Sequence, residues 1–153
     1  MTVGELAALL RGVQQRIPAE MERVVTAVTV DAARRARAYI GQERPEWPPL
    51  ADSTVEDKRA LGYTGHISPT DPLLRTGEMR DSIEGQVDGL VGVIGSNDKK
   101  ALWQEFGAHG TGRNRAGELP PRPFIGLGMQ HAAAESEALM LDAAARAFEG
   151  GGE

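Results

Sequence analysis

The side chains with the widest chemical repertoire in this sequence are three histidines, His66, His109 and His131. A zinc site, or a similar metal site, needs several histidine, cysteine or carboxylate ligands at characteristic spacings. The chain has no cysteine, and its histidines fall in two expected loops and at the start of an expected helix, at no such spacing. The sequence therefore predicts neither a metal nor a cofactor.

Motifs for catalysis are missing from the sequence as well. Neither the Gly-x-Ser-x-Gly turn of serine hydrolases nor the Gly-x-x-x-x-Gly-Lys-Ser/Thr phosphate loop occurs. The glycine-rich run 107–112 follows an expected helix, whereas phosphate-binding glycine loops lie between a strand and a helix. Glu135 and Glu137 are two positions apart on an expected helix and do not face each other. We therefore expect no enzyme, and a small site built from His109 and Glu105 is kept only as a third hypothesis.

Two arginine clusters could contact nucleic acid or an acidic partner. Arg34, Arg35 and Arg37 form one cluster, and Arg113 with Arg115 forms the other. The net charge of −5 argues against a protein whose main work is to coat nucleic acid. For the first cluster, the alternative is a solvated face with favourable charge near a helix C-terminus. A DNA-binding or regulatory module that uses these arginines is the second functional hypothesis.

The densest aromatic stretch is residues 101–128, which holds two of the three phenylalanines and one of the two tryptophans. Leu102, Trp103 and Phe106 fall at helical spacing and can present one apolar face. Gly107 is a plausible end for this helix. Three prolines in four residues then fix the backbone of a rigid segment. The residues predicted for the core of this stretch are Trp103, Phe106, Phe124 and Ile125.

Short motifs follow one another in a fixed order between residues 44 and 130. They are Trp47-Pro48-Pro49-Leu50, Thr54 with Lys58, Leu73 to Ile83, Glu105-Phe106-Gly107, and Pro121 to Leu127. In type and order these motifs resemble those of the virion morphogenesis proteins of tailed phages. These are the tail-completion or head–tail joining proteins of the Mu-like and related groups.

The resemblance implies a structural virion protein. Such a protein would assemble in the host cytoplasm into a homo-oligomeric ring at the head–tail junction, with six copies to match a tail. Its partners would be other head–tail connector proteins and the tail tube or terminator proteins. DNA would cross the lumen without specific binding, and no membrane would be involved. A ring also needs one patch of the subunit to meet a different patch on the next copy.

Long segments of the chain could supply such patches. Residues 42–74 are punctuated by prolines and read as an extended arm with one short helix. Loops of this length are uncommon in compact domains unless they have a function. Residues 108–120 form a second candidate arm, and the alternative for that segment is a surface loop. For Trp47, the alternative is that it folds back into the core of its own chain. The candidate interface residues are Trp47, Leu50, Tyr63, Arg113 and Arg115.

Length and composition are typical of one globular domain. The chain has 153 residues, of which 41% are hydrophobic and 25% are charged. No run approaches the roughly 18 apolar residues that span a bilayer, and the N-terminus lacks the basic-then-apolar order of a signal peptide. We expect an α+β fold in which a small antiparallel sheet packs against a long N-terminal helix and a C-terminal helix. Its parts are residues 1–41, 42–74, 75–128 and 129–149.

Helix signals occur at both ends of the chain. Thr2 and Glu5 form a capping-box pattern that opens a helix. Pro18 predicts a break or kink near Ile17, with a second helix from Pro18 to Ile40. The last helix is expected over residues 129–148, with a stripe of alanines that lets it lie close to a neighbouring element.

The middle of the chain predicts short elements. A helix over residues 53–61 would start from a hydroxyl N-cap, and another would begin near Thr76. Asp88-Gly89 between two β-like runs predicts a hairpin turn. Glycines within these strands indicate bulges or close approach by another backbone. Because two strands alone are marginally stable, a third strand is expected from the segment after Gly107 or from a neighbouring copy.

Overall fold

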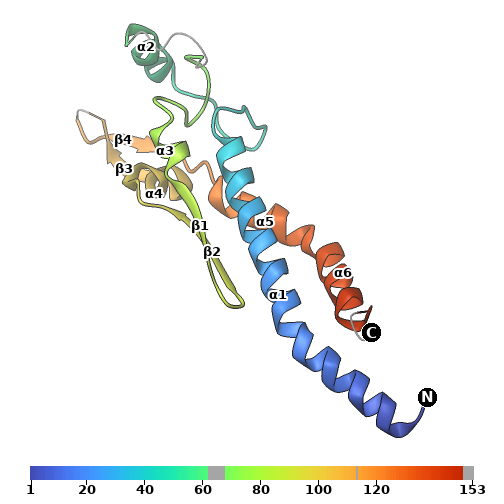
Figure 1. The fold of residues 1–153 in the computed structure, drawn as a ribbon. Coiled ribbons are helices and arrows are strands. Elements are labelled where there is room, and N and C mark those ends of the chain that lie inside the picture. The colour runs from blue at the N-terminus through green and yellow to red at the C-terminus, as the bar shows by residue number, and fades with distance from the viewer. Residues whose placement is uncertain (62–67, 113, 150–153) are drawn as a thin grey trace.

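The computed structural model describes residues 1–61, 68–112 and 114–149. It confirms the predicted α+β class: a long N-terminal helix and a C-terminal helical arm lie beside small antiparallel sheets (Figure 1). The helices are α1 (Val3–Tyr39), α2 (Asp52–Ala60), α3 (Glu78–Asp81), α4 (Lys99–Phe106), α5 (Ile125–Ala134) and α6 (Ser136–Glu149). The strands are β1 (Ile83–Asp88), β2 (Val91–Ser96), β3 (Ala108–Thr111) and β4 (Gly117–Leu119).

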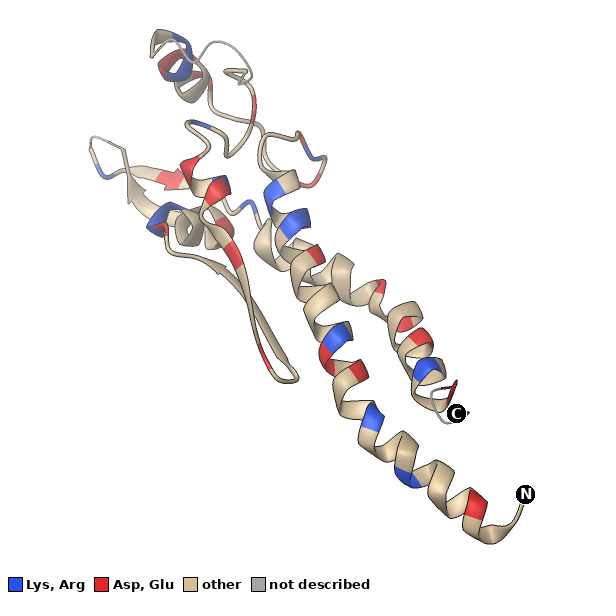
Figure 2. Cartoon of the chain, viewed as in Figure 1, with Lys and Arg blue, Asp and Glu red and all other residues tan. Residues whose placement is uncertain are grey.

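Helix α1 is 37 residues long and forms the spine of the molecule. The predicted capping box is present, because the Thr2 hydroxyl accepts from the Glu5 N–H while the Glu5 carboxylate accepts from the Thr2 N–H. The helix ends just before Gly41, whose φ of 91° suits glycine. Acidic and basic residues are interspersed along α1 and α6 (Figure 2).

Of the break or kink predicted near Ile17, the break is wrong, because α1 continues through Pro18. Proline removes one backbone hydrogen bond and crowds the preceding turn, but α6 holds α1 on both sides of it. Arg16 donates to the Ala147 carbonyl oxygen at 2.8 Å, and Glu20 pairs with Arg146 at 2.9 Å. The ribbon bends within its N-terminal half (Figure 1). Tertiary contacts therefore keep a helix that the local sequence disfavours.

The C-terminal arm consists of two helices, α5 and α6, that meet at Glu135, whereas the sequence predicted one. At the junction the Ser136 hydroxyl donates to the Ala133 carbonyl oxygen at 2.7 Å. Small residues bring this arm close to α1, since a Cβ atom at Gly128 would lie 2.8 Å from the Ala32 carbonyl oxygen. The buried residues of the predicted stripe are Ala132, Ser136, Ala143 and Ala147.

Strands β1 and β2 form an antiparallel hairpin that packs on α1. Its turn is Gly89-Leu90, one residue later than predicted, because Asp88 pairs with Val91. The segment after Gly107 does not supply the expected third strand, because it forms β3 and β4, which pair with each other in a separate sheet. A third strand from a neighbouring copy stays a prediction. Packing against a helix is what lets a two-stranded hairpin persist, and here α1 provides it.

Gly85 and Gly92 of this hairpin serve a close approach, chiefly to a side chain of α1, whereas the expected bulges do not occur in the strand register and nothing lies within 4 Å of a Cβ atom at Gly95. A Cβ atom at Gly92 would lie 1.9 Å from Thr29 Oγ1, and one at Gly85 would lie 3.0 Å from Thr29 Cγ2. Thr29 cannot easily move away, because it is buried and its hydroxyl donates to the Val25 carbonyl oxygen at 2.7 Å. The hairpin therefore lies directly on the surface of α1.

The short helices begin differently from the prediction. α2 follows Ala51, which has no side chain to cap it, so the expected hydroxyl N-cap is wrong. α3 follows Gly77, whose φ is 87°. The Thr76 hydroxyl does accept from the Glu78 N–H, at 3.4 Å.

One core joins these elements near the C-terminal end of α1. Phe124 and Ile83 are fully buried at its centre. The other buried members are Ala33, Ala36, Ile40, Trp47, Leu74, Met79 and Ala101. Residues from α1, from the 42–74 segment, from the hairpin, from α4 and from the 120–124 segment thus share a single core.

We expect Gly92→Ala to lower the free energy of unfolding by about 1–3 kcal/mol, because the new methyl group would overlap with Thr29. Denaturant unfolding measures this loss. Gly95→Ala is the matched control, since nothing lies within 4 Å of a Cβ atom at that position of the same strand. Equal effects of the two substitutions would contradict the close approach.

Phe124→Ala should lower the free energy of unfolding by about 3–5 kcal/mol, the usual cost of removing a buried phenylalanine side chain. Phe106→Ala is the control, because that side chain is 74% exposed. Thermal melting that stays unchanged for Phe124→Ala would place this ring outside the core.

Candidate assembly interface

The two halves of the aromatic stretch meet at the Glu105 carboxylate. Its oxygens accept hydrogen bonds from the backbone N–H groups of Phe124 at 2.8 Å, Ile125 at 2.9 Å and Gly126 at 2.8 Å. The first N–H groups of a helix lack partners within the helix, and its N-terminus carries partial positive charge. No local side chain caps α5 at Phe124. Glu105 of α4 therefore caps a helix that begins about twenty residues later.

Arg122 fastens the proline-rich arm to the same place. This side chain is buried, and its Nη2 atom donates to the carbonyl oxygens of Pro48 at 2.9 Å and Pro49 at 3.1 Å. Its backbone N–H donates to the Gln104 carbonyl oxygen at 2.7 Å. Burial lowers the pKa of the Arg122 guanidinium. The hydrogen bonds of Arg122 therefore hold the Trp-Pro-Pro motif and α4 next to the start of α5.

Trp47 belongs to the core of its own chain. It is 7% exposed and lies in the same cluster as Phe124. Its assignment as an interface anchor is therefore wrong for the single chain. The structure confirms the alternative, in which Trp47 folds back into the core of its own chain. The Arg44 guanidinium lies over the Tyr39 ring at 4.4 Å and over the Trp47 ring at 5.8 Å. These stacked groups close the core where α1 ends.

The outer face of α4 carries the largest exposed aromatic side chains of this region. Leu102 is 60% exposed, Trp103 is 49% exposed and Phe106 is 74% exposed. The prediction that Trp103 and Phe106 are core residues is therefore wrong. The helix turns its other face inward, because Ala101 is buried and Glu105 must reach the N-terminus of α5. The hydrogen bonds of Glu105 therefore orient α4, although its most hydrophobic face is left exposed to solvent.

The remaining predicted site residues are scattered. Ile125 is partly buried and packs against the core. Leu50 is half-buried beside Val55 in a shallow cavity under the arm. Arg115 is exposed, with a φ of 52°. Tyr63 and Arg113 lie outside the described residues.

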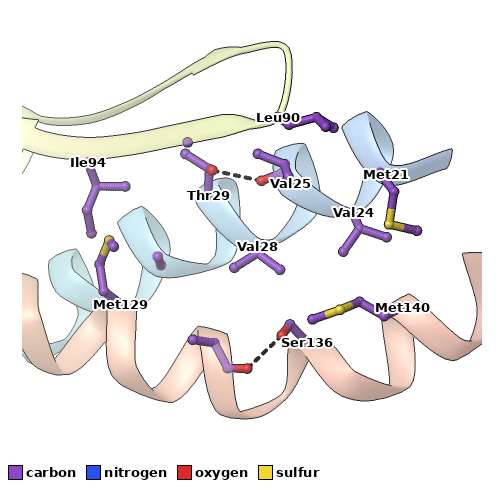
Figure 3. Close-up of a pocket in the computed structure, with 13 residues that line it drawn as sticks. Met21, Val24, Val25, Val28, Thr29, Leu90, Ile94, Met129, Ser136 and Met140 are labelled. Atoms are coloured by element: carbon purple, nitrogen blue, oxygen red, sulfur yellow. Dashed lines mark hydrogen bonds between the residues drawn. The ribbon is translucent and has the colours of Figure 1, made fainter. Parts of the chain in front are cut away.

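An apolar groove runs between the β1–β2 hairpin, α1 and the C-terminal arm (Figure 3). Its volume is about 400 Å³. Met21 and Met140 lie at one end, and Ile94 and Met129 lie at the other, with Val28 between them (Figure 3). The other lining residues are Val24, Val25, Thr29, Ala32, Leu90, Gly92, Ala133 and Ser136. None of the lining residues is charged.

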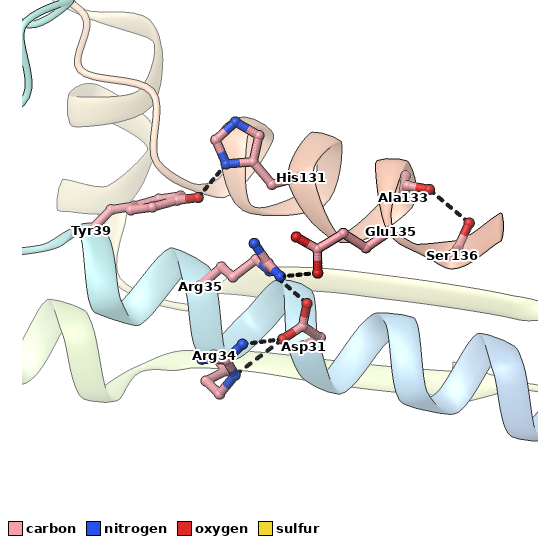
Figure 4. A network of polar contacts seen from close by, with 8 residues as sticks. All are labelled: Asp31, Arg34, Arg35, Tyr39, His131, Ala133, Glu135 and Ser136. Carbon is pink, nitrogen blue, oxygen red and sulfur yellow. Dashed lines mark hydrogen bonds and ion pairs between the residues drawn. The ribbon is translucent and has the colours of Figure 1, made fainter. Parts of the chain in front are cut away.

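The first arginine cluster is engaged within the molecule (Figure 4). Arg34 and Arg35 both pair with Asp31, and Arg35 also pairs with Glu135 of the C-terminal arm. The hydrogen bond from Arg35 is the largest cause that lowers the pKa of the Asp31 carboxyl. Arg37 donates to the Ile83 carbonyl oxygen at 3.0 Å.

A polar contact also joins the end of α1 to α5. The Tyr39 hydroxyl and the His131 Nδ1 atom share a hydrogen bond (Figure 4). The two rings meet edge to face, with centroids 5.9 Å apart. This histidine therefore takes part in packing the helices together.

The described residues can be compared with a metal site and with the His109 and Glu105 site of the third hypothesis. They contain no group of three or more His, Cys, Asp or Glu side chains that could hold a metal ion. His109 lies 3.2 Å from Glu118 across the β3–β4 hairpin, while both oxygens of Glu105 are occupied by backbone donors. The His109 and Glu105 pair of the third hypothesis is therefore not brought together. Within the described helices, none is both long and apolar enough to cross a membrane.

Comparison with known proteins adds no relative: no family model, no curated protein and no solved structure matches the chain. The resemblance of its motifs to tail-completion proteins therefore remains a prediction. Neither the apolar groove nor the capping role of Glu105 was predicted from the sequence. One signal for the cap was available, since Pro123 and Phe124 cannot cap α5 through their side chains.

We expect Glu105→Ala to lower the free energy of unfolding by about 2 kcal/mol, because three backbone N–H groups lose a charged acceptor. Glu105→Gln should cost less, since one carbonyl oxygen remains. Urea unfolding measures both. Glu137→Ala, an exposed carboxylate on α6, is the control and should change stability by less than about 0.5 kcal/mol. A Glu105→Ala variant as stable as this control would refute the cap.

Proposed function

We propose that this chain is a structural subunit that acts by assembling with copies of itself, and that it transforms no substrate. The assembly would be a ring at the head–tail junction of a tailed phage or phage-like particle. The ring would have six copies and would contact other connector proteins and the tail tube or terminator. Its location would be the virion, after assembly in the host cytoplasm.

The observation that carries the proposal is the surface area of the chain. It exposes 10334 Å², whereas a compact monomer of 16.4 kDa exposes roughly 7,500 Å². The excess is about 2,800 Å², and each partner buries about 800 Å² in an interface of standard size. A subunit in a ring forms two such interfaces, one with each neighbour. The chain therefore has more free surface than both would need.

The exposed apolar side chains of this surface also support the proposed assembly. Large exposed apolar patches on soluble proteins mark interaction sites, and buried aromatic side chains dominate interface energies. Helix α4 presents Leu102, Trp103 and Phe106 to solvent. Other exposed apolar side chains lie on α1, at the hairpin and on α6, including Leu6, Leu10, Leu90, Val91, Val93, Leu141 and Phe148.

Passage of DNA through the ring requires a wall that does not retain phosphates, since cationic walls bind them strongly. The net charge of −5 suits that requirement. The DNA-binding alternative has less support, because Arg34, Arg35 and Arg37 are occupied by partners within the chain. Of the second cluster, Arg115 is exposed and Arg113 lies outside the described residues. The resemblance of the motifs between residues 44 and 130 to those of tail-completion proteins supports the proposed location at the head–tail junction.

We expect light scattering on the purified protein to give a mass several times 16.4 kDa at high concentration. Trp103→Ala combined with Phe106→Ala should shift the mass towards the monomer and leave the melting temperature of the dilute, monomeric protein unchanged, because both side chains are exposed in the single chain. Leu61→Ala, which removes an exposed apolar side chain outside α4, is the control.

The biological role has its own test. Particles formed without this protein should show heads and tails that fail to join in electron micrographs. Joined, infectious particles without it would refute the role at the junction. A small-molecule product with genuine turnover would refute the structural proposal as a whole.

A further inference from the structure

We propose that the apolar groove of one subunit receives the outer face of α4 from the next subunit. This inference rests on the proposed assembly and names the two surfaces that meet in it. It requires one chain to carry both a projecting helix and a site for that helix, on different sides.

The groove has the length of a site for a short helix. Its floor follows α1 from Met21 to Ala32, which at 1.5 Å per residue is about 16 Å. The hairpin forms one wall and the C-terminal arm forms the other (Figure 3). Amphipathic helices bind in apolar grooves of this kind, with anchor side chains at positions i, i+3, i+4 and i+7.

Helix α4 presents that pattern outward. Lys99, Leu102, Trp103 and Phe106 stand at i, i+3, i+4 and i+7, and all four are exposed. Eight residues make a helix about 12 Å long, which fits within the length of the groove. The Glu105 cap fixes the rotation of α4, so this face is held outward before any partner arrives.

The charges beside the two surfaces are complementary. Each element that forms the groove carries an exposed carboxylate: Glu22 lies in α1, Glu137 in α6, and Asp88 at the end of β1. All three carboxylates are exposed, and none forms an ion pair within the described part of the chain. Lys99, at the head of the α4 face, is likewise unpaired there. An unpaired cation on α4 and unpaired anions on the elements that form the groove favour association of the two surfaces.

The helix and the groove of one chain cannot meet each other. α4 lies at the open end of the hairpin, beside the core near the C-terminal end of α1 (Figure 1), whereas the groove follows α1 from Met21 to Ala32. The contact must therefore join two copies through unlike patches, and contacts of that type close into rings. The main competing occupant is the projecting N-terminal half of α1, with Leu6 and Leu10 exposed. That segment lacks an aromatic anchor, and aromatic anchors dominate interface energies.

The natural absence of cysteine permits a direct test. We would prepare Leu102→Cys on α4 and Met140→Cys in the groove as separate full-length proteins, mix them, and add a short thiol–thiol cross-linker. Both positions are exposed, so neither substitution should alter folding, which melting would verify. The expected result is a covalent dimer in the mixture and none from either protein alone. The protein with both substitutions should give a ladder that ends at the ring copy number.

Further variants sharpen this result. Trp103→Ala added to the Leu102→Cys protein should lower the cross-linked yield roughly tenfold, as for loss of an anchor. Glu56→Cys on α2, mixed with Met140→Cys, controls for random collisions, since it is exposed and lies on neither surface. Leu6→Cys mixed with Met140→Cys tests the competing occupant.

The possible outcomes separate the two proposals. An oligomer that gives no Leu102–Met140 product, or that cross-links Met140 to position 6 instead, overturns this inference and leaves the proposed assembly standing. A protein that remains at 16.4 kDa at every concentration overturns both. A product from Leu102→Cys alone would show that α4 faces meet each other, which also overturns the inference.

Discussion

The interaction on which this structure depends is the binding of three backbone N–H groups by one carboxylate. Glu105 accepts from Phe124, Ile125 and Gly126, and this single contact has three consequences. It caps α5 at its partially positive end. It brings Phe124 into the core from the side. It also fixes the rotation of α4, because a carboxylate that must reach α5 determines which face of its helix points inward.

A second set of contacts makes this arrangement rigid. The Arg122 guanidinium donates to the carbonyl oxygens of Pro48 and Pro49. Trp47, next to these prolines in the chain, belongs to the same core cluster as Phe124. The motifs that resemble tail-completion proteins therefore fasten the chain to itself. Surfaces available to partners lie next to these motifs, on the outer face of α4 and in the groove beside α1.

Small residues explain why so much surface remains free. Gly92 and Gly128 bring the hairpin and α5 close to α1, so the layers are thin and the core is confined to one end of the spine. Thin layers bury little area for their length. The result is a frame whose parts are held in fixed positions while many apolar side chains stay exposed, which suits a subunit that is completed by its neighbours.

The sequence by itself determined the fold class, the capping box of α1, the hairpin and the close approach of its glycines, because these depend on local spacing and on residue size. Only the tertiary structure decided the continuity of α1 through Pro18, since contacts with α6 on both sides of that residue hold it. The same is true of the outward face of α4. Periodicity shows that Leu102, Trp103 and Phe106 share one side of a helix, but it cannot show which side is inside. That choice was made by a hydrogen-bond partner about twenty residues away in the chain.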